Sequence, residues 1–124
     1  MAFAWIVFSA SPSRAETCEM GLTKNWVVRD CTGRMIKAEK RFSRIISLYG
    51  AHTENLFSLG LEDEIIGVGS HPDYPPKART KPGFSPHDGP EKFLAARPGL
   101  VLVRPMIDRG YEPLMERLEN FGIT

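Results

Sequence analysis

The chain has 124 residues, a formal net charge of +1, 42% hydrophobic residues and 25% charged residues. This composition is typical of a folded protein with one modest core, and it argues against intrinsic disorder. A net charge so close to zero gives no electrostatic reason for binding nucleic acid or an anionic membrane surface, so we expect neither as a partner.

The first fifteen residues are typical of a secretory signal. An apolar run over residues 2–10 is followed by Ser11-Pro12-Ser13-Arg14-Ala15, with small residues at the two positions that a signal peptidase reads. We therefore expect residues 1–15 to be a signal peptide that is cleaved after Ala15. The run is too short to span a bilayer, so no membrane insertion of the mature chain is expected. The alternative is a buried N-terminal strand or helix.

Export would place the two cysteines in an oxidising compartment. Cys18 and Cys31 then form a plausible disulfide, since an even number of cysteines in an exported chain favours pairing. Closing so short a loop would contribute about 3 kcal/mol in the chain-entropy model. The alternative is two free buried thiols.

Residues 25–37 are expected to form a β-hairpin within an N-terminal segment over 16–44. Trp26, Val27 and Val28 favour a strand, Met35 and Ile36 favour its return, and the sequence Asp30-Cys31-Thr32-Gly33 between them is typical of a turn.

From residue 45 onward, strands and helices are predicted to alternate. Short apolar runs predict strands over 45–49, 65–68 and 100–103. A first helix is expected with Thr53 as its cap, Glu54 in its first turn and Gly60 at its end. Further helices are predicted from Pro90 to Ala96 and over 111–121. Residues 104–110 are expected to be a loop, and Ile123 to begin another strand.

This alternation predicts an α/β fold with a parallel sheet and flanking helices over residues 45–124, preceded by the hairpin. In such sheets, ligands bind beyond the carboxyl ends of the strands. The loops over 50–52, 70–74, 84–88 and 104–109 are expected at that rim. Their polar and aromatic side chains are His52, His71, Asp73, Tyr74, Phe84, His87, Arg104, Asp108 and Arg109, which include all three histidines of the chain.

The loop after the second strand, H-P-D-Y-P-P-K over 71–77, contains three of the ten prolines. Proline restricts φ and lowers the entropy that a loop loses on binding, so this loop is suited to presenting a preformed surface. It is equally consistent with a rigid connector.

Three stretches together resemble a known family. They are R-I-I-S-L-Y-G-A-H-T-E-N-L-F-S-L-G-L-E-D-E-I-I-G-V, then D-Y-P-P-K-A, then G-P-E-K-F-L-A-A-R-P-G-L-V-L-V. Over residues 26–123 the chain is similar to the N-terminal lobe of periplasmic substrate-binding proteins of ABC importers for ferric siderophores, haem or cobalamin. The resemblance implies two α/β lobes joined by a long helix, with the ligand between them. We therefore expect this chain to be one ligand-binding lobe, with the second lobe absent.

The resemblance also implies roles for individual residues, with a small-molecule metal chelate and an inner-membrane ABC permease as partners. Glu91 stands where the family places a glutamate that pairs with arginines of the permease, although a carboxylate at a helix start is also favoured by the helix dipole. Arg104 favours an anionic ligand. The implied ligand contacts are Tyr49, Ala51, His52, His71, Phe84, Ser85, Arg104 and Met106.

Three other functions remain open from the residues. The histidines His52, His71 and His87 could instead bind zinc or manganese directly. An α/β enzyme such as a chelatase or esterase is a further alternative, but no G-x-S-x-G motif or Gly-rich phosphate loop is present. We therefore expect no enzyme and no cofactor. A lone lobe could also self-associate through exposed leucines of the helix over 111–121.

Overall fold

The computed structural model describes residues 27–30, 33–37 and 40–124. The predicted signal peptide and the predicted Cys18–Cys31 disulfide lie outside the described residues. The chain divides into two compact units, residues 1–37 and residues 38–124, and each is described by itself.

The first unit contains the predicted hairpin. Strand β1 (Val27–Arg29) pairs antiparallel with β2 (Met35–Lys37), with Val28 opposite Ile36. Gly33 has a φ of 86°, the left-handed conformation that the turn requires. The hairpin is therefore confirmed.

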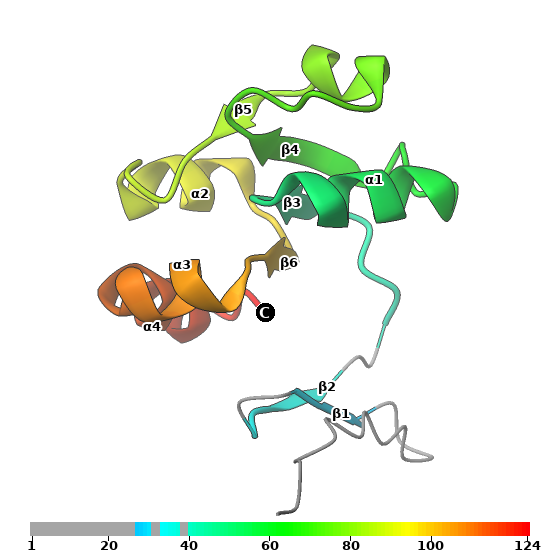
Figure 1. Ribbon diagram of the computed structural model, residues 1–124. Coiled ribbons are helices and arrows are strands. Elements are labelled where there is room, and N and C mark those ends of the chain that lie inside the picture. Colours follow the sequence, from blue (N-terminus) through cyan, green and yellow to red (C-terminus); the bar gives the residue numbers. More distant parts are fainter. Residues whose placement is uncertain (1–26, 31–32, 38–39) are drawn as a thin grey trace, which may run out of the picture. The chain divides into compact units, whose positions relative to one another are not determined.

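The second unit is a parallel sheet with helices, as predicted (Figure 1). The sheet order is β5-β4-β3-β6, and every neighbouring pair is parallel. The strands are β3 (Ile45–Ser47), β4 (Ile65–Gly69), β5 (Gly83–Phe84) and β6 (Leu100–Leu102). The helices are α1 (Gly50–Ser58), the 3₁₀ helix η1 (Pro76–Thr80), α2 (Pro90–Ala96), α3 (Pro105–Gly110) and α4 (Glu112–Asn120).

Both faces of the sheet are covered. Adjacent residues of a strand point to opposite faces, and Ile45 and Ile46 of the central strand accordingly join different clusters. Ile45 packs with Leu56 of α1, whereas Ile46 packs with Phe93 of α2 and Leu118 of α4. The alternation along the chain thus correctly predicted a doubly covered sheet.

The start of the first helix differs from the prediction. The helix begins at Gly50 with Tyr49 as N-cap, so Thr53 lies inside it and Glu54 is not in its first turn. Thr53 is buried, and its hydroxyl donates to Ser47 Oγ at 3.0 Å. Thr53 therefore connects α1 to Ser47 of β3 and does not cap the helix. Gly60, with a φ of 74°, follows the helix end as expected.

Residues 104–110 are not a loop, because α3 occupies Pro105–Gly110. Pro105 at the first helical positions and Asp108 in the first turn are favourable helix-start residues that the sequence reading had not used. Strand β5 was also not predicted, since it is only Gly83–Phe84. Residues 123–124 form no regular strand, but the Val101 amide donates to the Thr124 carbonyl at 2.8 Å, which places this end beside β6.

The expected exposed leucines of α4 are absent. Leu118 is buried, and Leu114 packs against the same cluster. They face the core because α4 covers one face of the sheet. Phe121, 62% exposed, is the large apolar side chain that remains uncovered near this helix, so the leucine-based reason for self-association is wrong.

Candidate functional site

A cavity of about 430 Å³ lies at the carboxyl ends of the sheet strands. The β4–η1 connection (residues 69–74) and the β5–α2 loop (residues 84–87) line two of its sides. The beginning of α1 contributes Gly50, Thr53 and Glu54, and the α3–α4 region contributes Ile107 and Tyr111. The cavity is where an open parallel sheet binds ligands, and its volume is within the usual range of about 300–1,000 Å³ for small-molecule sites.

The cavity contains some of the predicted ligand contacts and not others. His71, Phe84 and Ser85 line it, and so does His87, which had been considered as a metal ligand. The lining does not include Tyr49, Ala51, His52, Arg104 or Met106.

The β4–η1 connection contains a residue with an uncommon backbone conformation. His71 adopts a φ of 63°, a left-handed conformation that costs a residue other than glycine about 1–2 kcal/mol. The Arg79 guanidinium, on η1, donates to the carbonyl oxygens of Pro72 at 3.4 Å and Asp73 at 3.3 Å. This loop is therefore tied to the helix that follows it, which fits a preformed surface and a rigid connector equally.

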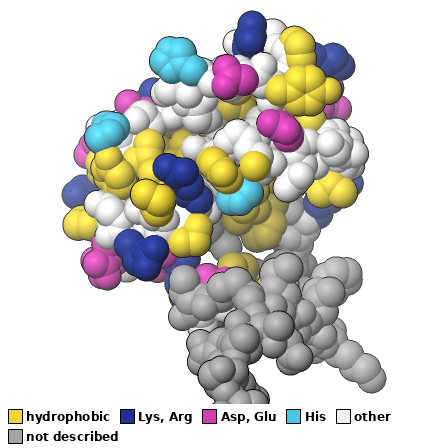
Figure 2. Space-filling model, viewed as in Figure 1, with side chains coloured by type: hydrophobic (Ala, Val, Ile, Leu, Met, Phe, Trp, Pro, Cys, Tyr) yellow, Lys and Arg dark blue, Asp and Glu magenta, His cyan; other side chains and the backbone are white. Residues whose placement is uncertain are grey.

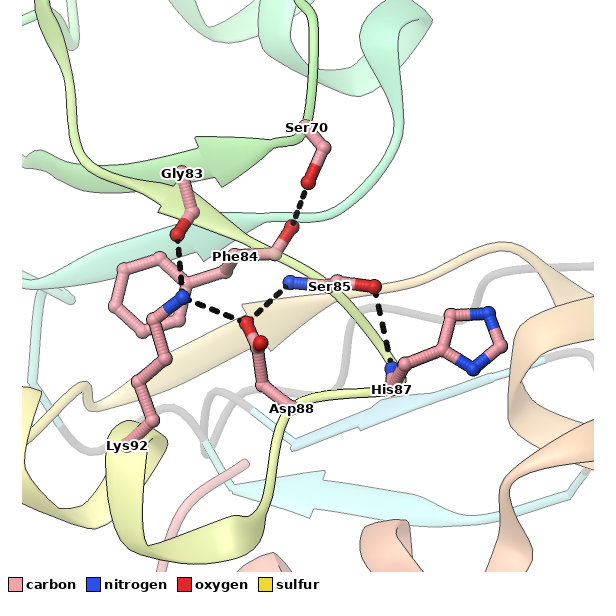
Figure 3. A network of polar contacts seen from close by, with 7 residues as sticks. All are labelled: Ser70, Gly83, Phe84, Ser85, His87, Asp88 and Lys92. Atoms are coloured by element: carbon pink, nitrogen blue, oxygen red, sulfur yellow. Dashed lines mark hydrogen bonds and ion pairs between the residues drawn. The ribbon is translucent and has the colours of Figure 1, made fainter.

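The β5–α2 loop is held by a compact polar network (Figure 3). Lys92 Nζ donates to the Gly83 carbonyl at 2.8 Å and to Asp88 Oδ2 at 2.7 Å. Asp88 Oδ2 also accepts the Ser85 amide at 2.8 Å. The His87 amide donates to Ser85 Oγ at 3.2 Å. One carboxylate and one ammonium thus close the loop that carries four cavity residues, 84–87.

The same network acts on the Asp88 carboxyl. Its hydrogen bond with Lys92, together with the Ser85 amide, lowers the pKa of Asp88 below its ordinary value. The network is complete only while this carboxyl is ionised. The stabilisation that it contributes is therefore present above the ordinary carboxyl pKa and is lost as the pH falls through the lowered pKa.

Substituting Lys92→Met should raise the pKa of Asp88, because the ammonium that favours the carboxylate is removed while most of the stem remains. A carboxyl-carbon NMR titration measures this pKa directly. Lys77→Met is the matched control, since Lys77 makes a comparable exposed ion pair with Glu62, at 3.0 Å, on another part of the lobe. An Asp88 titration that is the same in wild type and Lys92→Met would contradict the assignment.

On one wall of the cavity, the β5–α2 loop contacts the α3–α4 region, which is distant from it in the sequence. The Tyr111 hydroxyl lies 3.0 Å from Nε2 and 3.1 Å from Nδ1 of His87, and the two rings meet edge to face. Tyr111 and Ile107 were missed as site residues because α3 had been interpreted as a loop. The helix-start residues Pro105 and Asp108 were the signal that could have placed them.

A second cluster lies outside the cavity lining. Arg104, the N-cap of α3, has its guanidinium carbon 5.4 Å from the centre of the Tyr49 ring. His52 packs edge-on against the same ring, with 5.2 Å between the ring centres. We call these three residues the Tyr49 cluster. It presents an exposed cation on an aromatic ring, an arrangement that binds anionic or flat ligands.

The three histidines of the chain do not converge. Figure 2 shows three separate imidazole patches on the viewed face. Within residues 27–30, 33–37 and 40–124, no group of three His, Cys, Asp or Glu side chains could hold a metal ion. The His52–His71–His87 alternative therefore has no support in this structure, because His52 lies in α1, His71 in the β4–η1 connection and His87 in the β5–α2 loop.

The fold and the cavity are those of an α/β lobe, and comparisons with known proteins find similar lobes. No family model matches the chain. The vitamin B12-binding protein of Vibrio campbellii is 39% identical over 82 residues, which cover 64% of this chain and 29% of that protein. The chain spans less than a third of the length of the curated relatives that it matches.

Solved structures show the same similarity. A possible iron-binding periplasmic solute-binding protein from Staphylococcus epidermidis has a TM-score of 0.63 and 30% identity, over 68% of this chain and 34% of that chain. The periplasmic vitamin B12-binding protein of Vibrio cholerae has a TM-score of 0.57 and 32% identity, over 67% of this chain and 32% of that chain. The resemblance to a lobe of periplasmic substrate-binding proteins of ABC importers is therefore confirmed.

Proposed function

We propose that this chain is the ligand-binding lobe of a solute-binding protein that captures a metal chelate and delivers it to an ABC importer. The observation that carries the proposal is the cavity at the carboxyl ends of the strands, in a lobe that is similar to lobes of vitamin B12-binding and iron-binding proteins. Binding is the function that the names of these relatives support.

The ligand belongs to the class of cobalamin, haem and ferric siderophores. His71, Phe84 and Ser85 contact it in the cavity, where polar atoms and an aromatic edge lie together. The Tyr49 cluster extends the contact surface beyond the cavity, and its exposed Arg104 favours ligands that carry carboxylate or catecholate groups. Ala51 and Met106 are exposed at the starts of α1 and α3, where a large chelate would touch them.

Titrating the chain with cyanocobalamin, haemin and one ferric siderophore, and separately with free zinc and manganese, tests this proposal. Binding is followed by tyrosine and tryptophan fluorescence. Saturable quenching by one chelate is expected. A fluorescence response to free metal only would favour direct metal binding. No response to any chelate would contradict the proposed function.

The docking role of Glu91 is part of this proposal. Glu91 is exposed in the first turn of α2, next to the loop that lines the cavity. An exposed carboxylate in this position can pair with an arginine of a membrane permease and set the orientation and rate of docking.

Glu91→Ala should therefore slow chelate import in cells that produce the protein by about tenfold, while the Kd of the purified protein for the chelate stays unchanged. Glu116→Ala, which removes an exposed carboxylate from α4, is the control and should leave import as in the wild type. Equal import rates for the two variants would show that Glu91 does not dock.

We place the mature protein in the periplasm, after cleavage following Ala15. The support is the signal-like pattern of residues 1–15 and the similarity to periplasmic relatives. Among the residues that the structure describes, no helix is long and apolar enough to cross a membrane. Amino-terminal sequencing of the exported protein tests the cleavage site.

A further inference from the structure

The β5–α2 loop depends on a single ammonium group. The loop brings Phe84, Ser85 and His87 to the cavity, and its two ends meet at Lys92 Nζ. That nitrogen donates to the Gly83 carbonyl before the loop and to the Asp88 carboxylate after it. It also lies 5.0 Å from the centre of the Phe84 ring. Figure 3 shows these contacts converging on one side chain.

The Asp88 carboxylate transmits this constraint to the loop backbone. Its Oδ2 atom accepts both the Lys92 ammonium and the Ser85 amide. The amide of His87 is held in turn by the Ser85 hydroxyl, 3.2 Å away. Lys92 therefore orients the Ser85 backbone through Asp88, and Ser85 holds the His87 amide in turn, although the Lys92 side chain does not itself line the cavity.

The Lys92–Asp88 ion pair is partly exposed, so it should matter more for the geometry of the loop than for the stability of the fold. The side chain of Lys92 is 48% exposed and that of Asp88 is 28% exposed. Ion pairs this open to solvent contribute little to the free energy of unfolding. In contrast, small displacements of contact residues weaken binding strongly, because the binding surface must be preorganised. Loss of Lys92 should therefore affect ligand affinity much more than folding.

We propose that Lys92 is a positioning residue for ligand binding, which acts through Asp88 to hold the β5–α2 loop in its binding geometry. The inference rests on the proposed function and adds to it a residue that the ligand does not contact. It also gives the first turn of α2 two separate tasks, because Glu91 faces solvent there while Lys92 holds the cavity loop.

Three variants test the proposal: Lys92→Met, Lys92→Arg and the control Lys77→Met. Lys77 is also an exposed lysine paired with a carboxylate, and it does not line the cavity. Cyanocobalamin and haemin are titrated against each variant, and thermal unfolding is recorded alongside. Lys92→Met should bind whichever probe the wild type binds on the order of tenfold more weakly. Its unfolding temperature should match that of Lys77→Met, and Lys92→Arg should regain most of the affinity.

The second measurement requires no ligand. Amide NMR of the free chain should show the Ser85 amide resonance shifted and broadened in Lys92→Met, because the Asp88 carboxylate that accepts this amide is no longer held by Lys92. In Lys92→Arg the resonance should be restored. Unchanged Ser85 and His87 amides, or equal losses of affinity in Lys92→Met and Lys77→Met, would overturn the positioning role. If the wild type binds neither probe nor the ferric siderophore, the proposed function fails, and the amide resonances alone decide whether Lys92 positions the loop.

Discussion

Substituting Phe93→Ala should reduce the free energy of unfolding of the lobe by about 3–5 kcal/mol, the usual cost of removing a buried aromatic side chain. Phe93 is 0% exposed and is the largest of the fully buried side chains among the described residues. It packs with Ile46, Leu118 and Phe84, and its ring centre lies 5.2 Å from that of Phe84. A smaller side chain would leave a cavity between the sheet and two helices.

Urea unfolding, followed by circular dichroism, measures this loss. Phe121→Ala is the control, because Phe121 is 62% exposed and its loss should change stability by no more than about 0.5 kcal/mol. If Phe93→Ala leaves too little folded protein, Phe93→Leu keeps most of the volume and should cost less than about 1.5 kcal/mol. Equal midpoints for Phe93→Ala and Phe121→Ala would show that α2 is not packed as described.

The apolar runs were sufficient to predict three of the four strands of the sheet, β3, β4 and β6. Ile45 and Ile65 begin buried strands whose apolar runs are bounded by polar turns, and such runs between helices leave few topologies. The end of the first helix at Gly60 and the start of another at Pro90 were also predictable, because glycine and proline have strong positional preferences there.

Side-chain contacts over long separations were not predictable in the same way. Thr53 was interpreted as a helix cap from its type and position, but its hydroxyl bonds Ser47 on β3, a contact that exists only after the helix packs on the sheet. The meeting of His87 with Tyr111 depends on α3, a short helix that had been interpreted as a loop. The His87–Tyr111 contact was therefore missed through one error about an element.

Residues near strand ends were predicted to line the cavity, and the prediction was right for some of them and wrong for others. His71 lies two residues after the end of β4, Phe84 is the last residue of β5, and both line the cavity. Arg104 and Met106 were assigned to the same rim, but α3 begins there and they are not part of the lining. The sequence alone identified the correct edge of the sheet, whereas the direction of each side chain depended on the helix starts.

Substituting Gly67→Ala should destabilise the lobe by about 1–3 kcal/mol, because the added methyl group overpacks the core. A Cβ atom at Gly67 would lie 2.4 Å and 2.5 Å from two carbon atoms of the Phe84 ring. That ring has little freedom to withdraw, since Phe93 packs against it and the Lys92 ammonium lies over it. Because Phe84 also lines the cavity, the same substitution should weaken chelate binding.

Gly83→Ala is the matched control for Gly67→Ala. Gly83 pairs with Val68 in the neighbouring strand, and a Cβ atom there would meet nothing within 4 Å. Urea unfolding of both variants should show a loss for Gly67→Ala only. The double variant Gly67→Ala with Phe84→Leu should be more stable than the sum of the two single changes predicts, since the smaller side chain gives the methyl group room. Strict additivity of the two changes would mean that the Phe84 ring does not lie over Gly67, and the wall of the cavity would then need a different description.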